Sequence, residues 1–111
     1  ITLHCVIPLL EVLGNQGNMD IIPLLLCIIN KCCQISHEFQ ENICLLGGIP
    51  NILKFTDSDY SLDLRKEAAI FVRDLCQSSN PIALQMFIAC NGMPIFVKNY
   101  NGYQLMELIK F

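Results

Sequence analysis

The chain has 111 residues, of which 53% are apolar and 15% charged, and a formal net charge of −3. This length fits one small domain with a real core, and the acidic balance argues against nucleic acid or an anionic membrane surface as the main partner. The longest apolar run, 21–29, falls short of the roughly 20 residues that a bilayer span needs, and no signal peptide is recognisable at the start. Because the chain begins in apolar sequence without Met, we expect a piece of a longer protein.

The first half of the chain predicts four helices. An apolar segment predicts a helix over about 4–13, and Asp20 is expected to cap a long helix that ends near residue 35. Ser36 is expected to cap a short helix that stops at Gly47-Gly48, after which Pro50 restarts a second short helix.

The second half repeats this punctuation. The polar run 56–59 predicts a loop, and Ser61 or Asp63 is expected to start the next long helix. Asn80-Pro81 predicts a capped helix that stops at Asn91-Gly92, and Pro94 restarts a short one. The tail, Tyr103 to Phe111, could begin a further long helix, and no segment alternates with period two as a strand would.

Two short blocks recur at a spacing near 43 residues. Cys33-Gln34-Ile35-Ser36 returns as Cys76-Gln77-Ser78-Ser79 (76 − 33 = 43), and Gly47-Gly48-Ile49-Pro50 returns as Asn91-Gly92-Met93-Pro94 (92 − 48 = 44). Two- and three-helix repeats run at roughly 40–47 residues. The spacing therefore predicts a repeat protein.

The two long helices share one predicted buried stripe. Positions i, i+4, i+7, i+8, i+11 and i+12 from Leu64 are all apolar, and so are the positions 43 residues earlier. The stripes comprise Leu64, Ala68, Phe71, Val72, Leu75 and Cys76 in one helix and Ile21, Leu25, Ile28, Ile29, Cys32 and Cys33 in the other.

These elements resemble the armadillo repeat. The resemblance rests on a short helix ending in Gly47-Gly48-Ile49-Pro50, a second short helix and a long third helix containing Lys66-Glu67-Ala68-Ala69. The HEAT repeat is the nearest competitor, and the Gly-Gly-Ile-Pro break argues against it. The resemblance implies an all-α, right-handed armadillo-like superhelical solenoid of about two and a half three-helix repeats. The predicted organisation is a partial repeat over 1–35, a complete repeat over 36–79 and a partial repeat over 80–111.

A narrower resemblance rests on three blocks: 41–50 (ENICLLGGIP), 67–73 (EAAIFVR) and 84–88 (LQMFI). They look like the non-catalytic region of fungal septation-initiation and mitotic-exit network protein kinases and of the related plant epsilon-type mitogen-activated kinase kinase kinases. The resemblance implies a kinase domain elsewhere in the parent chain. It also implies a cytoplasmic or spindle-pole regulatory region that docks a Ras-like GTPase or a scaffold.

In an armadillo array the third helices line an inner groove, so the faces opposite the buried stripes are candidate protein-binding surfaces. One face carries Lys66, Ile70, Arg73, Asp74 and Gln77, and its earlier counterpart carries Pro23, Cys27, Asn30, Lys31 and Gln34. The groove residues that we predict to contact a partner are Lys31, Gln34, Lys66, Ile70, Arg73, Asp74 and Gln77. A solvated helix face of mixed charge is the alternative interpretation.

Other functions have weaker support. Seven cysteines at irregular spacing predict reduced core residues of a reducing compartment, and Cys32-Cys33 with Cys27 and His37 lacks zinc-site spacing. No kinase motif occurs, the carboxylates have no His or Lys partner nearby in the sequence, and Gly47-Gly48 ends a helix instead of forming a phosphate-binding loop. We therefore expect no catalytic residue, cofactor or metal, and a cysteine-based redox or metal site stays an alternative. A second alternative is self-association through apolar ends, at the front Val6, Ile7, Leu9 and Leu10 and at the back Leu105, Leu108, Ile109 and Phe111.

Overall fold

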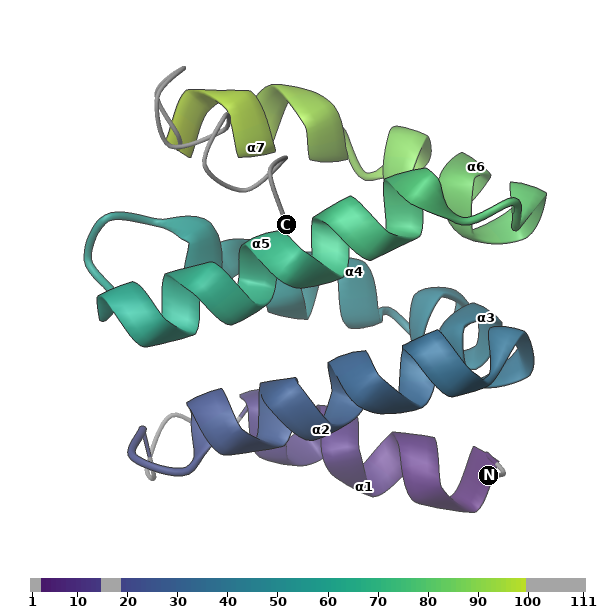
Figure 1. The fold of residues 1–111 in the computed structure, drawn as a ribbon, viewed down its shortest axis with the longest axis horizontal. Helices are drawn as coiled ribbons and strands as arrows, with labels where there is room; N and C mark the ends of the chain where they lie inside the picture. The colour runs from purple at the N-terminus through teal and green to yellow at the C-terminus, as the bar shows by residue number, and fades with distance from the viewer. Residues whose placement is uncertain (1–2, 15–18, 100–111) are drawn as a thin grey trace.

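The computed structural model describes residues 3–14 and 19–99, in which seven α-helices and one short 3-10 helix form and no β-strand occurs (Figure 1). In chain order the helices are α1 (Leu3–Gly14), α2 (Ile22–Ile35), α3 (His37–Leu45), α4 (Gly48–Leu53), the 3-10 helix η2 (Lys54–Thr56), α5 (Leu62–Gln77), α6 (Pro81–Ala89) and α7 (Gly92–Asn99). The predicted all-α fold is confirmed for this part of the chain. The helix predicted over Tyr103 to Phe111 lies outside the described residues.

Side chains at the predicted positions cap three helices. Each accepts a hydrogen bond from a backbone N–H of the first turn, which otherwise has no partner inside the helix. The pairs are Ser36 Oγ with Phe39 N at 3.1 Å, Ser61 Oγ with Leu64 N at 3.3 Å, and Asn80 Oδ1 with Ala83 N at 3.4 Å.

The predicted cap at Asp20 is wrong. Helix α2 begins at Ile22, and Ile21 occupies the capping position without a side-chain hydrogen bond. Pro23 lies in the first turn, where its fixed φ suits the helix. Because proline has no backbone N–H, the first turn has one fewer donor that needs a capping partner.

The predicted break between α3 and α4 depends on two glycines with different roles. Gly47 has φ +88°, a left-handed conformation that disfavours other residues. Gly48 is buried against α3, and a Cβ there would lie 2.6 Å from the carbonyl oxygen of Ile43. At the corresponding break between α6 and α7, Asn91 takes the left-handed conformation with φ 54°.

Corresponding helices stack on one another through the molecule. Helix α4 contacts both α1 and α7, α3 contacts α6, and α2 contacts α5. The two long helices α2 and α5 run side by side in the same direction (Figure 1). This arrangement places their solvent-facing sides next to each other.

The predicted buried stripe of α5 is confirmed except at its last position. Leu64, Ala68, Phe71, Val72 and Leu75 are buried, whereas Cys76 is exposed. Cys76 lies at the edge of the stripe in the final turn of the helix, where this edge meets solvent.

The predicted stripe of α2 is displaced by one residue. Ile29 and Cys33 are buried as predicted, but Ile21 and Ile28 are exposed and Leu25 and Cys32 are half-buried. The side chains that pack inward are Ile22, Leu26, Ile29, Asn30 and Cys33. They match the buried positions of α5 at an offset of 42 residues (64 − 22) instead of 43. Because α2 is apolar on nearly every side, its hydrophobic pattern alone could not set this phase.

The expected apolar front end is only partly exposed. Val6 and Leu10 are buried because α1 packs against α3 and α4, and Leu9 is half-buried, so Ile7 alone of the four residues is exposed. The four residues expected at the back end lie outside the described part of the chain.

Candidate protein-interaction face

The solvent-facing sides of α2 and α5 form one surface, which we call the α2–α5 face. Residues four, seven and eleven positions apart lie on the same side of a helix, here the side opposite the buried stripe. The face is defined by Leu24, Ile28, Lys31 and Ile35 of α2 and by Lys66, Ile70, Arg73 and Gln77 of α5.

An apolar row on α2 is the main feature of this face. The exposed fractions are 67% for Leu24, 54% for Ile28 and 82% for Ile35. An apolar side chain that remains in water gains no free energy from burial, and several exposed on one helix face are typical of an interaction site. Exposed Lys31 lies between Ile28 and Ile35 in this row. The prediction missed the three apolar residues because the 43-residue offset placed the wrong side of α2 outward. An offset of 42 would have aligned them with Lys66, Ile70 and Gln77.

The seven predicted groove residues do not all lie on this surface in the same way. Lys31, Lys66, Gln77 and Gln34 are exposed, as predicted. Ile70, Arg73 and Asp74 are half-buried, with Asp74 at the edge of the face, close to α2.

The residues expected to surround Lys31 and Gln34 require a correction. Asn30 is buried, with 3% of its surface exposed, and Pro23 and Cys27 are half-buried. Asn30 therefore faces α5 and not a partner, as the one-residue displacement of the stripe requires.

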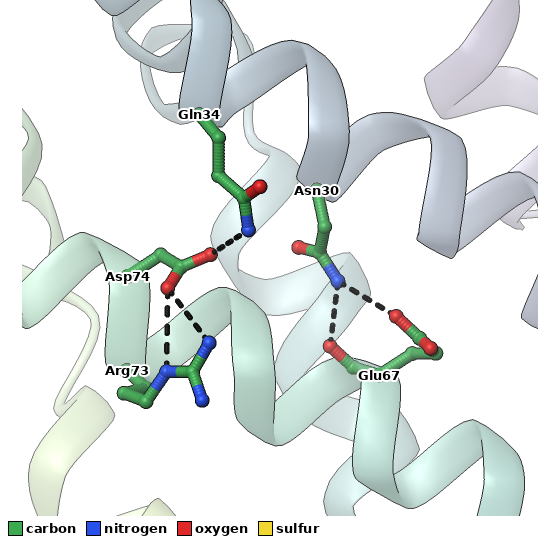
Figure 2. A network of polar contacts seen from close by, with 5 residues as sticks. All are labelled: Asn30, Gln34, Glu67, Arg73 and Asp74. Carbon is green, nitrogen blue, oxygen red and sulfur yellow. Dashed lines mark hydrogen bonds and ion pairs between the residues drawn. The ribbon is translucent and has the colours of Figure 1, made fainter. Parts of the chain in front are cut away.

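Polar contacts hold α2 and α5 together beside the face (Figure 2). Gln34 Nε2 donates to Asp74 Oδ2 at 2.7 Å, and Arg73 forms an ion pair with Asp74 Oδ1 at 3.2 Å. Asn30 Nδ2 donates to the carbonyl oxygen and to Oε1 of Glu67, at 3.0 and 3.1 Å. The Arg73–Asp74 pair is thus part of the helix–helix junction, so its removal would disturb structure as well as any partner contact.

Three predicted residues, Gln34, Asp74 and Gln77, meet around a small polar hollow at the C-terminal ends of α2 and α5. Its volume is about 210 Å³. Pockets for small organic ligands occupy roughly 300–1,000 Å³, so this hollow fits a single side chain better than a free ligand. Its lining residues are Cys33, Gln34, His37, Gln40, Asp74, Gln77 and Ser78.

A larger cleft of about 530 Å³ lies elsewhere, between α4, the loop after η2, and α7. None of the predicted groove residues lines it. The predicted loop over 56–59 contributes Asp57 and Asp59, and Asp57 Oδ1 accepts a hydrogen bond from the Asp59 N–H at 2.9 Å, as in a turn.

Two cysteines, Cys33 and Cys44, have the properties of core residues more than of reactive groups, whereas Cys76 is exposed. Burial raises the pKa of the Cys33 thiol and of the Cys44 thiol to about 12, so both are protonated near neutral pH and are poor nucleophiles. Cys32 is half-buried. Within residues 3–14 and 19–99, no group of three or more His, Cys, Asp or Glu side chains has an arrangement that could hold a metal ion.

No single helix in the described part of the chain is long and apolar enough to cross a membrane. Helices α6 and α7 together have the length and apolar composition of a membrane span, but the angle between them is 70°.

The chain is similar to short segments of proteins named as kinases or as cell-division proteins. It is 43% identical over 99 residues to MAP3K epsilon protein kinase 1 of Arabidopsis thaliana, with 87% of this chain and 7% of that protein aligned. It is 40% identical over 98 residues to cytokinesis protein sepH of Aspergillus niger, with 88% of this chain and 7% of that protein aligned. It is 34% identical over 102 residues to cell division control protein 7 of Schizosaccharomyces pombe, with 89% of this chain and 10% of that protein aligned.

The chain therefore spans only about 7% of the length of the first of these relatives. No protein-family model matches it, and no solved structure does. Since the aligned segment contains none of the protein kinase signature motifs, the similarity lies outside a kinase catalytic core. The chain is all-α over the residues that the structure describes and is similar to a non-catalytic part of cell-division and MAP3K-type kinases.

Proposed function

We propose that this chain is a protein-docking segment of the regulatory region of a larger cell-division protein kinase, and that the α2–α5 face contacts the partner. The observation that carries the proposal is the exposed row of Leu24, Ile28 and Ile35 on one side of a helix that is otherwise well packed. A segment without kinase motifs, yet similar to kinases, is suited to regulation or localisation of the enzyme.

We further propose that the helices belong to an armadillo-like, right-handed solenoid. The stacking of α1 on α4, of α4 on α7, of α3 on α6 and of α2 on α5 supports it, because each corresponding pair lies about one repeat apart. In such an array the α2–α5 face lines the inner groove. The partner class is then the one implied by the sequence resemblance, a Ras-like GTPase or a scaffold at the spindle pole body.

An affinity-capture experiment tests the docking role. The immobilised chain, its Ile35→Asp variant and its Ile88→Asp variant are incubated with extract from dividing cells. Ile88 is a matched control, because it is 72% exposed but lies on α6. We expect Ile35→Asp to lose the captured partner and Ile88→Asp to retain it. Equal capture by all three proteins would refute docking through this face.

A second candidate function is self-association, since α6 and α7 also expose Ile82, Ile88, Met93 and Val97. Light scattering over a concentration series tests it. A mass that rises with concentration and returns to that of a monomer in Ile88→Asp would favour assembly through α6 and α7, and a constant monomer would exclude it.

A further inference from the structure

The small polar hollow at the C-terminal ends of α2 and α5 adjoins the α2–α5 face. Gln77 belongs to both, and Gln34, which lines the hollow, directly precedes Ile35 at the end of the apolar row. The hollow has a volume of about 210 Å³, enough for one side chain. A partner that covers the face therefore meets the hollow with one of its own side chains.

Gln40 of α3 gives this hollow a buried hydrogen-bond donor. It lines the hollow but is only 3% exposed. Asn80 Nδ2 donates to Gln40 Oε1 at 3.5 Å, and because Asn80 Oδ1 caps α6, the two amides have a defined orientation. Nε2 of Gln40 has no acceptor among the residues that the structure describes, which leaves it for a ligand atom in the hollow. A buried donor without a partner is unfavourable, so this position favours a group that accepts a hydrogen bond.

Gln34 and Asp74 give the same hollow hydrogen-bond acceptors. Gln34 Nε2 donates to Asp74 Oδ2 at 2.7 Å, and the Arg73 guanidinium pairs with Asp74 Oδ1 at 3.2 Å (Figure 2). Arg73 thus balances the charge of the Asp74 carboxylate within the protein. Gln34 Oε1 accepts no hydrogen bond from the described part of the chain, so it remains available to a ligand donor.

These groups select a side chain that both donates and accepts hydrogen bonds. A carboxylate ligand would lie close to the Asp74 carboxylate, and no Lys or Arg is among the described residues that line the hollow. An ammonium or guanidinium group has no acceptor for Gln40, and an apolar side chain satisfies neither need. A primary amide carries its acceptor and its donors on separate atoms, so it can accept from Gln40 while it donates to Gln34 or Asp74.

We infer that the hollow binds the primary amide of an Asn or Gln side chain that the partner inserts beside the apolar row. This inference rests on the proposed docking function and assigns one polar contact within it. The apolar row supplies affinity, and the amide fixes the position of the partner along the face.

Four small probes test the chemistry of the hollow on the unmodified chain. They are the N-acetyl methylamides of glutamine, glutamate, methionine and lysine, which share one backbone and differ only in the side chain. Each probe is titrated into the isotopically labelled chain, and the side-chain amide signals of Gln40 and Gln77 are followed by NMR. We expect the glutamine probe to shift these signals saturably and to bind at least about tenfold more tightly than the other three probes.

A pair of substitutions separates the contribution of Gln40 from an unspecific effect. Gln40→Met keeps the length of the side chain and removes the amide, and Gln85→Met makes the same change at an exposed position of α6. Read from the signals of Gln77, the affinity for the glutamine probe is expected to fall about tenfold in Gln40→Met and to stay unchanged in Gln85→Met. Circular dichroism verifies the fold of each variant, and the comparison of the four probes decides the question if Gln40→Met does not fold.

Three results would overturn this inference. They are no saturable shift with the glutamine probe, equal binding of any of the other three probes, or equal effects of Gln40→Met and Gln85→Met in folded variants. If one of them occurs while Ile35→Asp still loses the captured partner, the docking role stands and only the amide contact is rejected. If the glutamine probe binds selectively but Ile35→Asp retains the partner, docking through the face fails, and the assignment of the amide to a partner fails with it.

Discussion

The placement of Asn30 toward α5 decides which side of α2 meets solvent, and the substitution Asn30→Asp probes it. The side chain is 3% exposed, and Nδ2 donates to two oxygens of Glu67 at 3.0 and 3.1 Å. An ionised carboxylate at this position has no hydrogen to donate and faces two acceptors at close range.

The expected loss of stability follows from these contacts. Two hydrogen bonds contribute roughly 1 kcal/mol each, and breaking a buried polar pair so that a charge stays uncompensated costs roughly 3–5 kcal/mol. We expect Asn30→Asp to lower the free energy of unfolding by about 3 kcal/mol or more at pH 7. Asn30→Leu also loses both hydrogen bonds, but it introduces no charge and removes Oδ1, which is buried without a hydrogen-bond partner, so it is expected to cost only about 1–2 kcal/mol.

Urea unfolding followed by circular dichroism measures these changes, with Lys31→Asp as the control. Lys31 is adjacent but exposed, so its substitution is expected to change stability by less than about 1 kcal/mol. A carboxyl introduced at position 30 is expected to ionise less readily in the folded state than in the unfolded chain, because it is buried beside the Glu67 carboxylate. The penalty relative to wild type is therefore expected to grow as pH rises above about 4, where the unfolded chain ionises. A cost of Asn30→Asp no larger than that of Lys31→Asp would refute the assigned phase of α2.

Three further predictions concern the helix break and the cysteines. Gly48→Ala is expected to destabilise the fold by about 3 kcal/mol in the same urea assay, because its Cβ would collide with a backbone oxygen of α3. Gly47→Ala is expected to cost about 1–2 kcal/mol, because the space around it is open but its φ is left-handed. Equal costs for the two substitutions would contradict this distinction. In a thiol titration of the native protein, Cys76 is expected to react before Cys33 and Cys44, and reaction of the latter two at the same rate as Cys76 would contradict their burial. The pKa values of the Cys33 and Cys44 thiols are about 12 in the folded protein, above the value of 9.0 for the unfolded chain. Their contribution to the free energy of unfolding is therefore complete below pH 9 and decreases between pH 9 and pH 12. The decrease is at most about 1.4 kcal/mol per pH unit for each thiol.

The elements that the sequence predicts correctly are those in which local chemistry decides the outcome. Ser36, Ser61 and Asn80 each satisfy an N–H within their own turn, so no distant contact is needed to place them. The phase of α5 is also predictable, because charged residues such as Lys66 mark its solvent side.

The phase of α2 depends on tertiary contacts that a sequence pattern does not contain. Ile22–Ile35 offers apolar residues on most sides, and the predicted stripe is fully apolar, whereas the observed one includes Asn30, so the hydrophobic pattern favours the wrong phase by one residue. What selects the phase is a polar contact: Asn30 packs inward because Glu67 of α5 accepts its hydrogen bonds. For this reason the apolar row of the candidate site, Leu24, Ile28 and Ile35, was missed, while Lys31 on the same row was found.

Site-specific photo-crosslinking tests most directly whether partners contact the α2–α5 face. A crosslinking amino acid replaces Ile28 on this face in one variant and Ile88 on α6 in another, and each variant is irradiated in extract from dividing cells. The docking account predicts a discrete crosslinked partner from position 28 and none of that species from position 88. Crosslinking of the same partner from position 88 alone, or equally from both positions, would contradict it.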